Sequence, residues 1–386
     1  MPVLLKLIFR NLFRHKLRTG LTLCGICVAI LSFGLLRTVI SAWYAGVEAS
    51  SANRLITRNS ISLIFPLPLS YQERIQGVEG VKTVSYGNWF GGIYIEEKNF
   101  FANFAVEPRT YLELYSEYLL PEEQKQAFLR DRRACIVGRK LAKRFDWKID
   151  DIIPLRGTVF PGHWEFVLRG IYSGRDSRVD ESQFFFHWDY LNETLKRKEP
   201  LRADQVGIYI LSVANPELAA ETAARVDRVF KNSYAETLTE TEKAFQLGFV
   251  ALTEAILLVI QLVSFVVIVI IMAVAANSMS MSVRERLGEY AVFKTLGFGG
   301  LYLGMLILGE SLLIAAVGGT GGVLLTFPSA RAFLKYLGDY FPIFLVTQQT
   351  VMLQGLAALA VGFAAAVLPI WRAVRVNITQ ALGRIG

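Results

Sequence analysis

Four stretches of the chain are apolar over membrane-crossing lengths, and they are separated by segments that mix polar and apolar positions. A hydrocarbon core about 30 Å thick needs roughly 20 apolar residues in a helix to cross it. With their immediate flanks, stretches of this length occupy 21–44, 249–276, 301–327 and 351–370. We therefore predict four transmembrane helices.

About two hundred residues, 45–248, separate the first span from the second and have the pattern of a folded domain. Runs rich in β-branched and aromatic residues, bounded by turn residues, predict strands. These runs lie at 61–66, 80–87, 91–97, 100–108, 134–137, 163–172 and 205–213. Amphipathic helices are expected at 138–145 and 217–230, the second with Asn215 as its cap. The predicted fold class is a four-helix membrane protein with a large α+β extracytoplasmic domain inserted between the first two spans.

Composition and charge support this organisation and orient it. Hydrophobic residues make up 53% of the chain, and the mean hydropathy is +0.38. Segment 45–248 is balanced, with 27 Lys and Arg against 28 Asp and Glu. Eleven basic residues lie before the first span, between the second and third, and after the fourth: Lys6, Arg10, Arg14, Lys16, Arg18, Arg284, Arg286, Lys294, Arg372, Arg375 and Arg384. Positive-inside bias then places both termini and 277–300 in the cytoplasm and 45–248 outside, so the net charge of +8 reflects topology and gives little support for nucleic-acid binding.

The remaining segments complete the predicted layout. Residues 1–20 alternate apolar and basic positions, which predicts an amphipathic helix along the cytoplasmic face in contact with membrane lipid. Residues 328–350 form a short extracytoplasmic connection, and 371–386 form a cytoplasmic tail. The first span lacks a convincing cleavage site, so we expect it to be retained.

Catalytic and cofactor chemistry finds little support in the sequence. His15, His163 and His187 have no partners at metal-ligand spacing, and the glycine run at 318–322 lacks the Lys-Ser/Thr of a phosphate loop. Close helix packing explains Gly318 and Gly322 better. The C-x-x-C pair at 24–27 lies inside a span, where packing is the simpler interpretation, and Cys135 is alone in the outer domain. We expect no catalytic, metal or cofactor site; an intramembrane enzyme is a weak alternative.

Two charged features need a different explanation. Glu310 lies within the third span, where a carboxylate is costly and usually faces a partner helix, water or a functional path. The alternative is that it is wetted near an interface.

The second feature is the charged stretch 277–300, which follows the second span at once. Residues 283–296 are expected to continue that span as a short cytoplasmic helix, in which Arg286 and Glu289 pair at i,i+3. A helix tied to two spans can act as a lever. A solvated turn is the alternative.

Four motifs give the chain a family resemblance. They are "RNLFRHKLRTGLTLCGI" (10–26), "ACIVGRKLAKRFDWKIDDIIPLRG" (134–157), "NSMSMSVRERLGEYAVFKTLGFGGLYLGMLILGES" (277–311) and "LPIWRAVRVNITQAL" (368–382). Together they resemble the FtsX/MacB-type ABC transporter permeases of the mechanotransmission class. The resemblance implies a MacB-like periplasmic domain at 45–248 and a place in the bacterial inner membrane. It also implies partners: a separate ABC ATPase dimer that binds the ATP, and a second permease copy or paralogue.

The resemblance also assigns roles to residues. It implies that the ATPase-coupling segment comprises Arg284, Glu285, Arg286, Glu289 and Tyr290, and that Glu310 is the family's acidic residue in the third span. The expected function is export of a small molecule, toxin or lipid with a periplasmic adaptor and an outer-membrane channel. The alternatives are release of lipoproteins from the membrane and non-transporting, FtsX-like regulation of a cell-wall hydrolase. Transport predicts substrate-dependent ATP turnover, whereas regulation predicts a hydrolase bound to 45–248.

Overall fold

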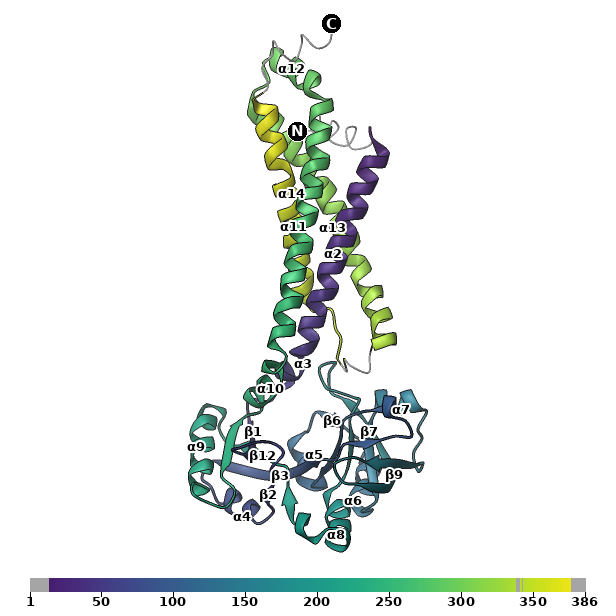
Figure 1. Cartoon of the computed structure of the whole chain (residues 1–386), viewed down its shortest axis with the longest axis vertical. Coiled ribbons are helices and arrows are strands. Elements are labelled where there is room, and N and C mark those ends of the chain that lie inside the picture. Colours follow the sequence, from purple (N-terminus) through teal and green to yellow (C-terminus); the bar gives the residue numbers. More distant parts are fainter. Residues whose placement is uncertain (1–13, 338–340, 342, 376–386) are drawn as a thin grey trace. The chain divides into compact units, whose positions relative to one another are not determined.

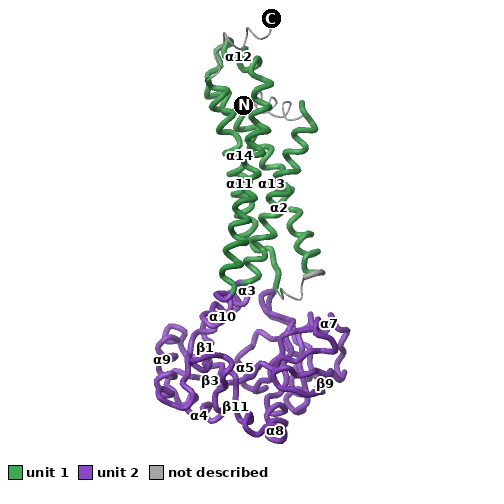
Figure 2. The backbone as a smooth tube through the Cα atoms, in the orientation of Figure 1, with its two compact units in different colours: residues 1–43, 253–386 green, residues 44–252 purple. Residues whose placement is uncertain are grey.

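The computed structural model describes residues 14–337, 341 and 343–375. The chain divides into two compact units (Figure 2): unit 1 comprises Met1–Trp43 and Thr253–Gly386, and unit 2 comprises Tyr44–Leu252. Most of the predicted N-terminal amphipathic helix and of the C-terminal tail, and part of the 328–350 connection, lie outside the described residues.

Unit 1 is a bundle of long helices (Figure 1). Its elements are α2 (Lys16–Trp43), α11 (Glu254–Glu285), α12 (Leu287–Thr295), α13 (Gly300–Leu337) and α14 (Gln348–Val374). Among the described residues, four of these helices, all except α12, are long and apolar enough to cross a membrane. The prediction of four apolar spans is confirmed.

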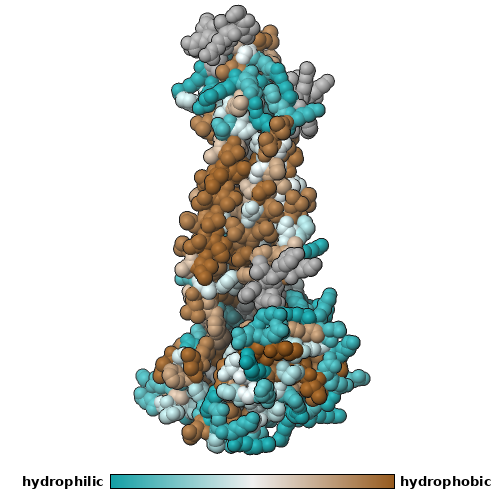
Figure 3. All heavy atoms as spheres, turned by 45° about the vertical axis from the view of Figure 1, so that its right-hand side comes forward, coloured by the Kyte–Doolittle hydropathy of each residue, from teal (hydrophilic) through white to brown (hydrophobic). Residues whose placement is uncertain are grey.

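Close packing of α13 on α2 and α14 forms the centre of unit 1. A Cβ atom built on Gly322 would lie 2.7 Å from the carbonyl oxygen of Cys27, and one on Gly318 would lie 3.0 Å from that of Leu23. Both glycines therefore let α13 approach the backbone of α2, as the G-x-x-x-G spacing predicted. Large apolar side chains point outward around the bundle, and Figure 3 shows them as a broad hydrophobic belt on unit 1. Such a surface is suited to lipid.

Unit 2, all of whose residues are described, is built on a mixed sheet of eleven strands. The strand order is β13-β1-β12-β3-β5-β10-β7-β9-β8-β4, with β6 paired to β9 and a separate pair, β11 and β2. Neighbours are antiparallel except β5 with β10 and β7 with β9. The strands are β1 (Arg54–Asn59), β2 (Leu67–Pro68), β3 (Val81–Trp89), β4 (Gly92–Ile93), β5 (Asn103–Val106), β6 (Tyr118–Leu119), β7 (Ala134–Gly138), β8 (Ile152–Gly157), β9 (Gly162–Gly174), β10 (Phe184–His187), β11 (Gln205–Val206), β12 (Ile208–Val213) and β13 (Thr237–Thr241).

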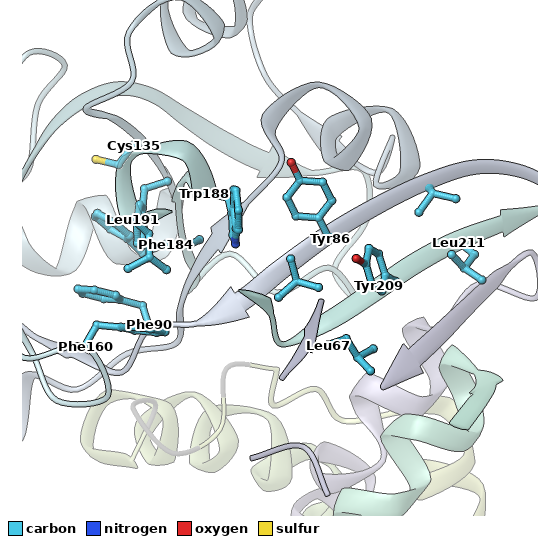
Figure 4. Packing of buried hydrophobic residues seen from close by; sticks show 14 of the residues in the cluster. Leu67, Tyr86, Phe90, Cys135, Phe160, Phe184, Trp188, Leu191, Tyr209 and Leu211 are labelled. Carbon is cyan, nitrogen blue, oxygen red and sulfur yellow. The ribbon is translucent and has the colours of Figure 1, made fainter. Parts of the chain in front are cut away.

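Helices contribute to the cores on both faces of this sheet. They are α3 (Ala45–Ala49), α4 (Tyr71–Gln76), α5 (Pro108–Leu114), α6 (Glu122–Arg130), α7 (Arg139–Phe145), α8 (Trp188–Lys198), α9 (Ala219–Val229) and α10 (Glu242–Ala251), with short 3₁₀ turns at Glu97–Asn99, Pro200–Arg202 and Pro216–Leu218. Because side chains alternate along a strand, Phe184 and Phe186 of β10 enter one core while Phe185 enters the other. Helices α4, α7, α8 and α9 complete the first core, part of which is drawn in Figure 4, and α5 and α6 complete the second.

The structure confirms several predicted elements of unit 2 and corrects others: of the strand expected at 91–97 only Gly92–Ile93 (β4) forms, and the strand expected at 205–213 is interrupted at Gly207, between β11 and β12. The strand expected at 163–172 is β9, the strand-to-helix unit at 134–145 is β7 followed by α7, and the Asn215 side chain accepts a hydrogen bond from the Glu217 amide. The strand predicted at 61–66 is wrong. Strand β1 ends at Asn59, whose side chain accepts the Ile61 amide and turns the chain, so the apolar residues that follow lie in a loop.

Candidate functional site

The predicted coupling segment is divided by a break at Arg286. Helix α11 ends at Glu285, the Arg286 backbone leaves the helical region (φ −107°, ψ 13°), and α12 begins at Leu287. The single helix predicted over 283–296 is therefore wrong, and Arg284 and Glu285 belong to the end of α11. Gly297, at φ +91°, then allows the tight turn between α12 and α13.

The break directs the Arg286 side chain into the bundle, where it meets Glu310 of α13. Nη1 of Arg286 donates a hydrogen bond to Oε2 of Glu310 at 2.9 Å, and each residue is only 5% exposed. Glu310 is thus buried and paired with another helical segment rather than wetted at an interface. Removing one partner of such a pair usually costs about 3–5 kcal/mol, because the other charge stays buried.

Glu289 of α12 extends this pair into a chain of alternating charges. Its Oε2 lies 3.4 Å from Nε of Arg286, the predicted i,i+3 contact, and its Oε1 accepts a hydrogen bond from Arg14. Burial alone would raise the pKa of Glu289, but the two guanidinium groups lower it, so the carboxylate stays ionised at neutral pH. Together Arg14, Glu289, Arg286 and Glu310 link a residue two positions before α2 to α12 and α13.

A second set of contacts ties the same end of α2 to α11. Arg18 donates to both carboxylate oxygens of Glu285, at 2.8 and 2.7 Å, and Nε2 of His15 lies 3.4 Å from Glu285. One turn further along α2, the hydroxyl groups of Thr22 and Ser278 are 2.8 Å apart. The ends of α2, α11, α12 and α13 are therefore connected by polar contacts.

Tyr290 fixes α12 from its apolar side. Its side chain is fully buried, and the Arg286 guanidinium lies 5.2 Å from the centre of its ring. Burial raises the pKa of Tyr290 to about 12, so the phenol is neutral at physiological pH. The surrounding cluster comprises Val283, Leu303, Leu306, Ile307 and Ala373. Tyr290 and Arg286 thus hold α12 on the bundle and do not face solvent.

The solvent-facing side of this region carries apolar residues. Val292 is 46% exposed, Leu296 is 69% exposed, and Phe298, at the turn that follows, is 39% exposed. We call these three residues the α12 tip. Figure 3 shows hydrophilic residues around this end of unit 1, where Arg284 and Glu285 are also exposed. An exposed apolar patch within a charged, wetted surface is typical of a protein-binding site.

Comparisons with known proteins match both parts of the chain. Residues 261–378 match the family described as FtsX-like permease C-terminal. The chain is 24% identical over 339 residues to an uncharacterized ABC transporter permease of Methanocaldococcus jannaschii, covering 82% of this chain and 81% of that one. The two matches support an FtsX-type ABC transporter permease. A permease of this kind implies an ATPase partner, is generally non-catalytic itself, and spans the membrane several times.

Two solved structures are weakly similar to the permease. One is the extracellular domain of the noncanonic ABC-type transporter YknZ from Gram-positive bacteria, with 12% identity and a TM-score of 0.37, covering 49% of this chain and 100% of that one. The other is a domain of a putative permease protein from Porphyromonas gingivalis, with 14% identity and a TM-score of 0.32, covering 49% and 90%. TM-scores this low do not define the fold of unit 2.

The residues that the sequence singled out in the permease divide by position. Arg286, Tyr290 and Glu310 are brought together inside the bundle, Glu289 lies at its edge, and Arg284 and Glu285 are exposed. Sequence reasoning missed all three residues of the α12 tip, Val292, Leu296 and Phe298, as an exposed apolar surface. The available signal was that apolar residues occur on every side of α12, more than one buried face requires. Within the described residues, no group of three His, Cys, Asp or Glu side chains could hold a metal ion.

Proposed function

We propose that the permease couples ATP hydrolysis on a separate ABC ATPase dimer to movement of unit 2 outside the cytoplasm. The α12 tip docks in a groove of the ATPase. The ion pairs that Arg286 makes with Glu289 and Glu310 transmit the movement of α12 to the membrane helices. The work done is export of a small molecule, toxin or lipid, with a periplasmic adaptor and an outer-membrane channel. A second copy of the permease, or a paralogue, completes the membrane part of the transporter.

The observation that carries this proposal is the way α12 is held. Its outer side offers an apolar contact, while its inner side is fixed to α13 through Arg286 and Glu310 and to the end of α14 through Lys294, whose Nζ donates to the Val374 carbonyl at 2.8 Å. A force applied to α12 therefore reaches α13 and α14. A solvated turn would transmit nothing.

Leu296→Asp tests the docking step. The side chain is 69% exposed, so the change should leave folding of the permease intact. A charge placed in an apolar contact should abolish the stimulation of ATP hydrolysis by the permease. The measurement compares ATP turnover of the co-purifying ATPase in lipid nanodiscs with wild-type permease, Leu296→Asp and the matched control Leu296→Met, which should stimulate normally. Full stimulation by the aspartate variant would refute docking through the α12 tip.

The orientation is tested by labelling single cysteines. On a background without native cysteines, Ser177→Cys in unit 2 should react with a membrane-impermeant maleimide in intact cells. Ser177 is exposed, and it lies in the segment that is predicted to be outside the cytoplasm. Thr295→Cys, at the exposed end of α12, should react only after lysis. The reverse pattern would overturn the topology.

A further inference from the structure

Both connections between unit 2 and the transmembrane helices pass through one buried, charged cluster. The chain leaves α2 through α3 and enters β1 at Arg54; it leaves β13 and begins α10, which leads to α11, at Glu242. Nε of Arg54 donates to Oε2 of Glu242 at 2.9 Å, and the two residues are 5% and 6% exposed. The Ser51 amide also donates to Glu242, at 2.7 Å. The incoming strand β1 and the outgoing strand β13 are thereby joined where they meet α3 and α10, which we call the stalk segments.

A third segment, residues 114–117 between α5 and β6, completes the cluster. Nη1 of Arg54 donates to the Leu114 carbonyl at 3.0 Å, and Nη2 lies 2.7 Å from Oε1 of Glu117. The Tyr115 hydroxyl donates to Oε1 of Glu242 at 3.2 Å, and the Tyr115 ring lies 4.2 Å from the Arg54 guanidinium carbon. Each nitrogen of the guanidinium and each oxygen of Glu242 is therefore engaged, and we call this group the Arg54 cluster.

Stability alone is a poor reason for such an arrangement. A buried ion pair is often no more stable than well-packed apolar residues of the same volume, because desolvation offsets the attraction. What directional ionic contacts add is a fixed geometry among the three segments that they join. The Arg54 cluster is thus suited to holding α3, α10 and segment 114–117 in fixed positions relative to one another.

Segment 114–117 leads directly to a groove on unit 2. Arg175 of the β9 end donates its amide to the Glu117 carbonyl and its side chain to the Ser116 carbonyl, both at 2.9 Å. The Tyr115 ring stacks on that of Tyr118, with centroids 5.5 Å apart. The groove is about 470 Å³ and is lined by Leu112, Ser116, Tyr118, Leu119, Leu120, Pro121, Glu122, Lys125 and Ser173. Residues of the Arg54 cluster and residues of the groove wall are neighbours in one short segment.

We propose that the Arg54 cluster is the point at which movement of the stalk segments enters unit 2 and is passed to the wall of this groove. A shift of α3 against α10 moves Arg54 and Glu242, and segment 114–117 follows because it is bonded to both. The groove wall then changes its hydrogen bonding with each ATP cycle. This inference rests on the proposed function.

Hydrogen exchange on the full complex tests it. The permease with its co-purifying ATPase is placed in nanodiscs, and exchange is compared with and without ATP and vanadate. In the wild type, the backbone amides of residues 112–120 should change their rate of hydrogen exchange when ATP and vanadate are added. In Arg54→Met/Glu242→Leu, which replaces the pair by apolar groups, that difference should be lost while stimulation of ATP hydrolysis persists. The matched control, Arg225→Met/Glu79→Gln, removes an ion pair outside the cluster and should leave the difference intact.

The outcomes separate the two proposals. If the double variant keeps the nucleotide-dependent difference, or if the wild type shows none although it stimulates the ATPase, the role of the Arg54 cluster is refuted and the coupling proposal stands. If the wild type does not stimulate the ATPase, both fall. Should the double variant not fold, Glu117→Gln removes only one arm of the cluster and should reduce the difference; an unchanged difference there refutes the inference equally.

Discussion

Glu310→Ala should leave the permease inserted in the membrane but sharply destabilised and unable to stimulate its ATPase. The change removes the carboxylate that Arg286 bonds at 2.9 Å, and the guanidinium cannot reach solvent without displacing α12. Arg286 would keep only its 3.4 Å contact with the half-exposed Glu289. Breaking a buried pair costs about 3–5 kcal/mol, a large part of the stability of most domains. The expected consequence is that α12 detaches from α13, which disconnects the α12 tip from the bundle.

Unfolding by denaturant in detergent and ATP turnover in nanodiscs measure the two effects. For the unfolding measurement, Glu285→Ala is the matched control, because its pair with Arg18 is partly exposed and adds little to stability. Arg286→Met/Glu310→Leu should recover the lost stability, since it removes both charges together. If Glu310→Ala unfolds at the wild-type midpoint, the pair does not hold α12.

Gly322→Ala should separate α13 from α2 and lower the free energy of unfolding by about 1–3 kcal/mol. The new methyl group would lie 2.7 Å from the Cys27 carbonyl oxygen and 2.8 Å from the Cβ of Ile30, which are atoms fixed to the α2 backbone. No side-chain rotation relieves that contact, so one helix must shift. The effect should be visible as a lower unfolding midpoint and a weaker yield of folded protein.

Gly355→Ala provides the control for this change. Gly355 lies within α14, and a Cβ atom there meets nothing within 4 Å. The same substitution should therefore be neutral or stabilise the helix by up to about 1 kcal/mol, the difference in helix propensity between the residues. Equal midpoints for the two variants would mean that α2 and α13 do not depend on the glycine contact.

What the sequence could predict was local. The length of the apolar stretches identified the spans, and the spacing of Gly318 and Gly322 identified a packing face. Both features depend only on residues that are close together in the sequence. The partner of Glu310 could not be predicted, since Arg286 was assigned to a continuous, solvent-facing helix, and only a break in that helix directs it inward. The Arg54 and Glu242 pair spans 188 residues and exists because the sheet order places β1 beside β13.

The strand expected at 61–66 shows a related limit. Its composition favours a strand, but strand formation requires partners, and the pairings of β1 with β12 and β13 end at Arg58 and Asn59. Apolar residues beyond that point have no neighbouring strand in this register. Composition gave the propensity of this segment but not the position of its partners.

The arginines that pair with carboxylates at the α12 end of unit 1 act at two different times in the life of the chain. Before the bundle forms, Arg14, Arg18 and Arg286 are unpaired cations, and in that state the positive-inside rule predicts that they orient the emerging helices. After folding, each is bonded to Glu289, Glu285 or Glu310. Under the predicted topology, these charges are neutralised only after they have oriented the helices. Under the proposed function, membrane insertion and mechanical coupling then depend on the same three side chains, so a substitution at any of them is expected to affect both processes.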